Sequence, residues 1–130
     1  MAIAPRSFGS AALVLAGAFV AGVAHAGSTL FSPVTFARSG ADLQCIATNV
    51  GKKAQTIQVQ LISFDGKTIF KDTTPVLVDA GASINGAADD PSENLAYCKV
   101  TAKGAKTTVR AAILVHDGMT GEILLQVPAQ

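Results

Sequence analysis

The amino-acid sequence predicts an all-β protein, a single antiparallel β-sandwich that follows an N-terminal signal peptide. Three observations lead to this prediction. Apolar and polar residues alternate with a period of two through most of residues 27–130, and two cysteines stand far apart in strand-like segments. Turn-forming residues recur about every ten positions, as in a sandwich of about seven strands. No stretch after residue 26 has the spacing of an amphipathic helix.

The first 26 residues have the composition of a helical secretory signal peptide. Arg6 is their only charge, and the apolar segment that follows is too short to span a bilayer comfortably. Ala24 and Ala26 flank His25 in a small-x-small pattern, so we expect signal peptidase to cleave before Gly27. An uncleaved membrane anchor is the alternative, which the polar residues after the apolar segment disfavour. We therefore expect one exported domain, residues 27–130, in the periplasm or the extracellular medium, without stable membrane insertion after cleavage.

Each expected strand is an alternating or apolar run between turn signals. Ile57, Val59 and Leu61 share one face of such a run, and Asp65-Gly66 after it favours a hairpin because glycine tolerates positive φ. The polar run 89–94 is expected to be a loop. The strand-like segments are residues 43–48, 56–64, 69–70, 76–78, 83–88, 95–102, 107–116 and 122–127.

Cys45 and Cys98 are the two cysteines of the chain, and in an exported domain such a pair predicts a disulfide bond. A redox-active pair is the alternative, but such cysteines are usually close in sequence. Their positions match an immunoglobulin-like bridge between two sheets. The chain lacks tryptophan, and Tyr97 adjoins Cys98, so we expect Tyr97 to point away from the disulfide.

Several short motifs keep this order along most of the mature chain: Leu43-Gln44-Cys45, Thr48-Asn49-Val50-Gly51, Asp65-Gly66-Lys67, Ala80-Gly81, Tyr97-Cys98-Lys99-Val100 and Val109-Arg110-Ala111. In them the chain resembles a group of short exported bacterial proteins of uncharacterised function, with a single-disulfide immunoglobulin-like β-sandwich. The motifs consist of turns, a cysteine pair and core positions. The resemblance therefore implies a fold and no particular reaction or ligand.

The charge composition argues against nucleic acid as a partner. The whole chain has 10 Lys and Arg and 9 Asp and Glu, so removal of Arg6 with the signal peptide leaves a formally neutral domain. Such a domain has no overall field that attracts a polyanion.

We expect no enzyme activity, no metal and no cofactor, because no catalytic or ligating set of side chains can be assembled. His116 is the single histidine after cleavage, and no serine stands in a G-x-S-x-G elbow. His116 and Met119 offer a nitrogen and a sulfur to Cu(I), but we favour a solvated histidine at a strand end. Asp89, Asp90 and Glu93 would suit a carboxylate pair or Ca²⁺, but we favour a solvated loop.

The sequence suggests one candidate binding surface. If Lys103-Gly104-Ala105-Lys106 forms a two-residue hairpin, the flanking strands pair and Lys99 faces Arg110. A basic ribbon results, which we interpret as a stripe for an anion or an acidic partner; the alternative is an ordinary solvated sheet face. The ribbon residues are Tyr97, Lys99, Lys103, Lys106 and Arg110.

We therefore expect an exported, non-catalytic binding or structural module, and a monomer. Its partner is an unknown protein or an acidic glycan. One alternative is a polymerising, fimbria-like surface subunit that borrows a strand from its neighbour. Another is an inhibitor of an extracellular enzyme, which would present a loop such as 89–94.

Overall fold

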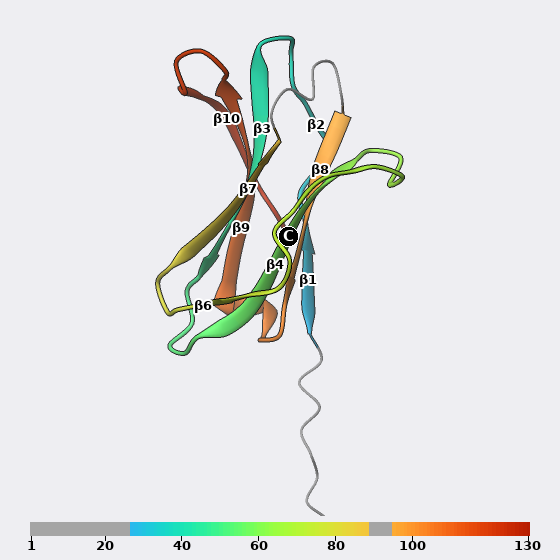
Figure 1. Ribbon diagram of the computed structural model, residues 1–130. Helices are drawn as coiled ribbons and strands as arrows, with labels where there is room; N and C mark the ends of the chain where they lie inside the picture. Colours follow the sequence, from blue (N-terminus) through green and yellow to red (C-terminus); the bar gives the residue numbers. More distant parts are fainter. Residues whose placement is uncertain (1–26, 89–94) are drawn as a thin grey trace, which may run out of the picture.

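The structure, a computed structural model, describes residues 27–88 and 95–130 as two antiparallel β-sheets packed against each other (Figure 1). Its elements are β1 (Ser28–Phe31), β2 (Thr35–Phe36), β3 (Ala41–Asn49), β4 (Gln55–Ser63), β5 (Ile69–Asp72), β6 (Val76–Val78), β7 (Ser83–Ala88), β8 (Leu95–Ala102), the short 3₁₀ helix η1 (Lys106–Thr108), β9 (Val109–Asp117) and β10 (Ile123–Pro128). Sheet A has the order β1-β8-β4-β5, with β2 paired to β8 and β6 paired to β4. Sheet B has the order β10-β9-β3-β7.

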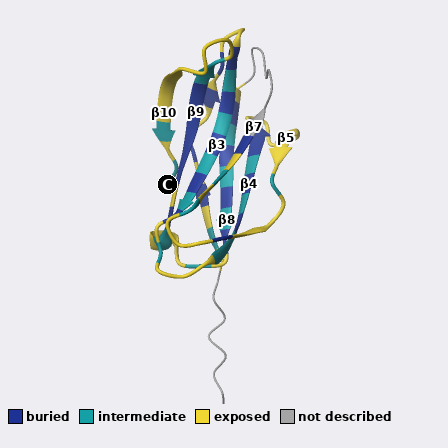
Figure 2. Ribbon diagram, turned by 60° about the vertical axis from the view of Figure 1, so that its left-hand side comes forward, coloured by how far each residue is buried: buried dark blue, intermediate teal, exposed yellow. Residues whose placement is uncertain are grey.

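The predicted all-β sandwich is confirmed, with more strands than expected. The described residues form ten strands instead of about seven: β1 and β2 precede the first of the eight strand-like segments, and each of those segments corresponds to one strand. The period-two pattern works as predicted: β3 alternates between buried and half-buried residues along its whole length (Figure 2). In β4, Ile57, Val59 and Leu61 all lie in the core between the sheets.

The predicted Asp65-Gly66 turn connects β4 to β5. Gly66 has a φ of +73°, which a residue with a side chain rarely adopts. The Asp65 carboxylate accepts hydrogen bonds from the Ser63 hydroxyl at 2.6 Å and from the Lys67 N–H at 3.0 Å. The local sequence therefore determines this hairpin.

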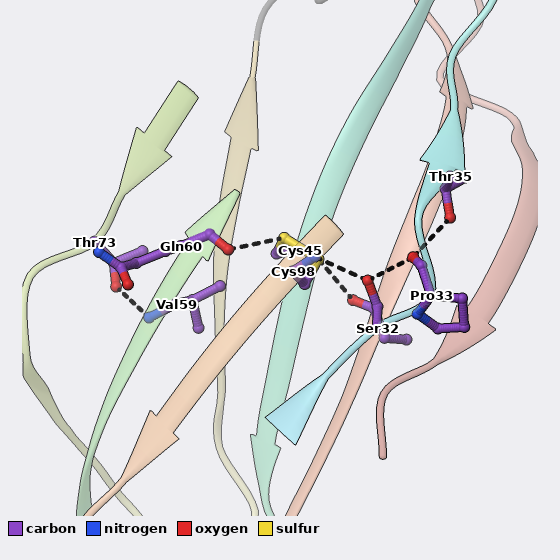
Figure 3. Close-up of a disulfide and its surroundings, with 9 residues drawn as sticks. Ser32, Pro33, Thr35, Cys45, Val59, Gln60, Thr73 and Cys98 are labelled. Carbon is purple, nitrogen blue, oxygen red and sulfur yellow. Dashed lines mark hydrogen bonds between the residues drawn. A yellow bond between two sulfur atoms is a disulfide. The ribbon is translucent and has the colours of Figure 1, made fainter. Parts of the chain in front are cut away.

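The predicted disulfide joins the centres of the two sheets, from Cys45 in β3 to Cys98 in β8 (Figure 3). Its Cα atoms are 5.7 Å apart, and both cysteines are fully buried. Ser32 anchors the N-terminal segment beside it: the Cys98 N–H donates to Ser32 Oγ at 2.8 Å, and the Ser32 N–H donates to the Cys98 carbonyl at 3.0 Å.

Strand β1 closes one side of the sandwich. It pairs with β8 from Ser28↔Ala102 to Phe31↔Lys99, and Leu30 enters the core. Phe31 and Gln130 also exchange two backbone hydrogen bonds of 3.0 Å, so the C-terminal end of the chain lies on the other side of β1. The first strand of the domain thus connects the edge of sheet A to the last residue of the chain.

Some sequence-based predictions concern residues outside the described ranges. These are the signal peptide, residues 1–26, with the cleavage-site residues Ala24 and Ala26, and the polar run 89–94 with Asp89, Asp90 and Glu93. Gly27, the expected first residue of the mature chain, directly precedes β1.

Candidate functional site

The basic ribbon predicted from a β8–β9 hairpin does not form, and the predicted pairing was wrong. Strand β8 pairs within sheet A and β9 pairs within sheet B. Lys99 stands opposite Gln60 and Phe31, whereas Arg110 stands opposite Thr48 on the outer face of the other sheet.

The connection between β8 and β9 explains this error. The Lys103 N–H donates to the Thr56 carbonyl, and η1 then carries the chain across to sheet B. Gly104 does not take the positive φ of the expected turn. A Cβ atom at this position would instead clash with Oε1 of Gln55, so the Gln55 side chain would have to shift to admit any other residue here.

The five ribbon residues lie in three places. Tyr97 and Lys99 are half-buried on the outer face of sheet A. Lys106 and Arg110 line a shallow hollow beside Leu30 and Gln130, where Arg110 Nη1 donates to the carbonyls of Thr107 and Val109. Lys103 lies in a separate groove.

That groove has a volume of about 600 Å³. It lies at the end of the sandwich where the β3–β4 connection meets the β8–η1 connection, at the bottom of Figure 1. Lys52, Lys53 and Lys103 line it, and none of the described residues that line it is acidic. Its other lining residues are Gly51, Ala54, Gln55, Thr56, Leu77, Gly104, Ala105 and Thr108.

A buried polar network built on Asn49 holds the two connections together. Asn49 is fully buried, and its Nδ2 donates to the carbonyls of Lys53 and Val78, both at 2.9 Å. Its Oδ1 accepts from the Gly51 N–H at 3.0 Å and from Gln55 Nε2 at 2.7 Å. All four hydrogen-bonding positions of the Asn49 amide are therefore used.

Gln55 extends this network to the far side of the groove. Its Nε2 also donates to the Thr108 carbonyl at 3.1 Å, and its Oε1 accepts from the Thr108 hydroxyl at 3.2 Å. The same hydroxyl lies 2.6 Å from the Ala105 carbonyl. Because both walls of the groove bond to one set of side chains, the backbone that carries the lysines is held in place.

The opposite end of the sandwich carries acidic turns. Asp65 lies in the β4–β5 turn, and Asp117 and Glu122 flank the β9–β10 turn. Hydrogen bonds from the N–H groups of Thr120 and Met119 hold the pKa of Asp117 below its ordinary value, and the Ser63 hydroxyl does the same for the pKa of Asp65. The lysines of the groove and these acidic turns thus lie at opposite ends of the sandwich.

His116 is half-buried, so the expectation of a solvated histidine was wrong in this respect. It lines a small hollow with Asp42 and Asp117, and its Nε2 is buried without a hydrogen-bond partner in the described structure. Met119 is 95% exposed. No group of three histidine, cysteine or carboxylate side chains suited to a metal ion occurs within residues 27–88 and 95–130.

Sequence reasoning missed Lys52, Lys53 and the Asn49 network. The Lys52-Lys53 pair directly after the predicted Asn49-Val50-Gly51 turn was the available signal. The three lysines are grouped only because Ile57 pairs with Ala102, which brings Lys103 to the same end of the sandwich as Lys52 and Lys53.

In the part of the chain that the structure describes, no helix has the length and apolarity to cross a membrane. Comparison with known proteins gives no relationship: no family model, no curated protein and no solved structure matches this chain.

Proposed function

We propose that this protein is an exported, non-catalytic binding module that holds an acidic polysaccharide in the groove lined by Lys52, Lys53 and Lys103. One observation carries the proposal: three lysines meet at a hollow whose described lining contains no carboxylate. Disulfide formation between Cys45 and Cys98 fits an oxidising compartment outside the cytoplasm.

The lining of the groove favours a sugar acid over a small inorganic anion. Ala54, Leu77 and Ala105 give part of it an apolar surface between the lysines. A pyranose ring presents an apolar C–H face together with a carboxylate, so one uronic acid unit uses both kinds of surface. Lysine supplies flexible point charges without the bidentate geometry of arginine, so the three lysines can contact successive charged units of a polymer without a fixed geometry.

The two sequence-based alternatives have less support. A polymerising subunit would need an open strand position, whereas β1 of the same chain pairs with β8 along its length. An inhibitor that uses residues 89–94 would depend on a segment outside the described ranges.

The test is binding to polygalacturonate, with neutral dextran as the control polymer, measured by affinity electrophoresis and calorimetry. We expect wild-type protein to bind polygalacturonate alone, and binding to weaken at high salt because screening shortens the range of charge attraction. The Lys53→Gln/Lys103→Gln variant should bind about tenfold more weakly, since it loses two cation–carboxylate contacts.

The matched control is Arg38→Gln/Lys67→Gln, which removes two charges at the other end of the sandwich and should bind as wild type does. Failure of the wild type to bind polygalacturonate would refute the proposal. So would an equal loss of binding in the groove variant and the control.

A further inference from the structure

The outer face of sheet A carries an unusual set of apolar side chains. Tyr97 of β8, Ile62 of β4 and Ile69 of β5 stand side by side in one row across the sheet. Ile62 is only 7% exposed, yet it does not belong to the core cluster between the sheets. The apolar patch comprises Phe31, Phe36, Ile62, Ile69, Leu95 and Tyr97.

The patch is continuous and partly open to solvent. Phe36 pairs with Leu95, and the rings of Phe31 and Tyr97 have centroids 6.2 Å apart. Phe31, Phe36 and Ile69 are each about half exposed. Contiguous exposed apolar surface is typical of sites where a protein contacts another molecule.

In the next row along the same face, β8, β4 and β5 carry polar residues with two opposite charges, and Phe31 of β1 stands beside Lys99. Gln60 of β4 stands between Lys99 on β8 and Asp72 on β5. The Asp72 carboxylate is oriented by Gln58 Nε2 at 2.9 Å, by Gln60 Nε2 at 3.2 Å and by the Thr74 N–H at 3.0 Å. The cation and the anion thus lie one strand to either side of β4, about 10 Å apart at normal strand spacing.

Two copies of this face can match each other row by row. A twofold axis that runs along β4 in the plane of the contact exchanges the β8 side of the sheet with the β5 side. Lys99 of each copy then stands over Asp72 of the other, and Tyr97 stands over Ile69. Gln60 and Ile62 meet their own counterparts.

We propose that two copies of this chain pair face to face through sheet A, with Lys99 of each copy on Asp72 of the other. The sequence alone favours a monomer. A face that meets only solvent, however, gives no reason for the cation and the anion to stand symmetrically about β4. A second copy covers the row of Tyr97, Ile62 and Ile69 and pairs the two charges, whereas Phe31 and Phe36, on β1 and β2, lie beyond the edge of the partner's β5. Because the axis runs along the strands, both lysine grooves lie at the same end of the dimer.

Sedimentation velocity across a dilution series, without any ligand, measures the oligomeric state and so tests the proposal. We expect wild type to be a dimer. Lys99→Asp and Asp72→Lys should each weaken dimerisation at least about tenfold, because each creates two like-charge contacts across the axis. An equimolar mixture of these two variants should recover the dimer, since every contact in the mixed pair is again between opposite charges.

Circular dichroism of each variant shows whether it is folded, and recovery in the mixture excludes misfolding as the cause of a loss. Ile69→Asp provides a second test, since it should separate the copies and should not recover on mixing with either charge variant. A wild type that stays monomeric overturns the proposal, as does a dimer that survives both charge variants. Absence of recovery in the mixture also overturns it. None of these readouts depends on polysaccharide binding.

Discussion

The side-chain amide of Gln55 donates a hydrogen bond of 2.7 Å to the Oδ1 atom of Asn49, inside the end of the sandwich that carries the lysine groove. This contact links the β3–β4 connection, which Asn49 organises, to Thr108, which Gln55 reaches with both its nitrogen and its oxygen. The geometry of the groove therefore depends on two neutral side chains that do not supply its charge.

Replacement of Asn49 tests the importance of this network. Asn49→Ala leaves the Val78 carbonyl and the Gly51 N–H without their side-chain partner, and we expect a loss of about 2–4 kcal/mol in unfolding free energy. Urea denaturation measures it. Asn85→Ala, at an exposed position in β7, is the matched control and should change stability by less than about 0.5 kcal/mol. Equal stability of the two variants would contradict this role.

Gly104 and Gln55 should be energetically coupled. Gly104→Ala introduces a Cβ atom that clashes with Gln55 Oε1, and overpacking of this kind costs about 1–3 kcal/mol. In a Gln55→Ala background the clash is absent, so the same substitution should cost less. A double-mutant cycle of unfolding free energies measures the difference. Additive costs would show that the clash is relieved in another way.

The disulfide should supply a large part of the stability. Cys45 and Cys98 are separated by 53 residues, and a closed loop of this size contributes about 4 kcal/mol in the chain-entropy model. The Cys45→Ala/Cys98→Ala variant should lose roughly that amount in denaturant unfolding. Wild-type protein treated with a reductant should unfold at the same denaturant concentration as the variant. A variant as stable as oxidised wild type would contradict this prediction.

Asp117 should make stability depend on acid pH. Its folded pKa is lowered from 3.8, chiefly by the Thr120 N–H, so the ionised carboxylate is better stabilised in the folded state than in the unfolded state. Its contribution is complete above the unfolded pKa and disappears as the pH falls through the folded pKa. Asp117→Asn should therefore be less stable than wild type at pH 7, with a difference that shrinks below about pH 4. Thermal unfolding at several pH values measures this, and a difference that is constant with pH would contradict it.

Processing at the N-terminus can be tested directly. We expect the protein recovered from outside the cytoplasm to begin at Gly27, as determined by intact mass and N-terminal sequencing. Ala26→Asp should retain the leader, because signal peptidase accepts small residues at this position. Recovery of the whole chain from the wild type would favour the membrane-anchor alternative.

Local sequence determined some parts of the fold and not others. The strand β3, the inward face of β4 and the Asp65-Gly66 turn follow from alternation and from turn chemistry within a few residues, and all were predictable. The short strand β1 was not predictable, because its four residues become a strand only through pairing with β8.

The candidate site was harder to predict from the sequence, for the same reason. Lys103-Gly104 looks like a hairpin turn when only adjacent strands are considered. Its real path is set by Thr56 and Gln55, which lie in a strand far earlier in the chain. The grouping of Lys52 and Lys53 with Lys103 depends on that same long-range pairing.

The position of β1 also affects the order in which the chain can fold. Ser28 bonds to Gly104 across 76 residues, and Ser32 bonds to Cys98 across 66. The earliest part of the domain to be synthesised therefore has no partner until nearly all of the chain has emerged. Contacts this distant in sequence make folding slow. A nascent or truncated chain would present its unpaired first strand and an unbridged Cys45 together, and aggregation or mispairing is most probable at that stage.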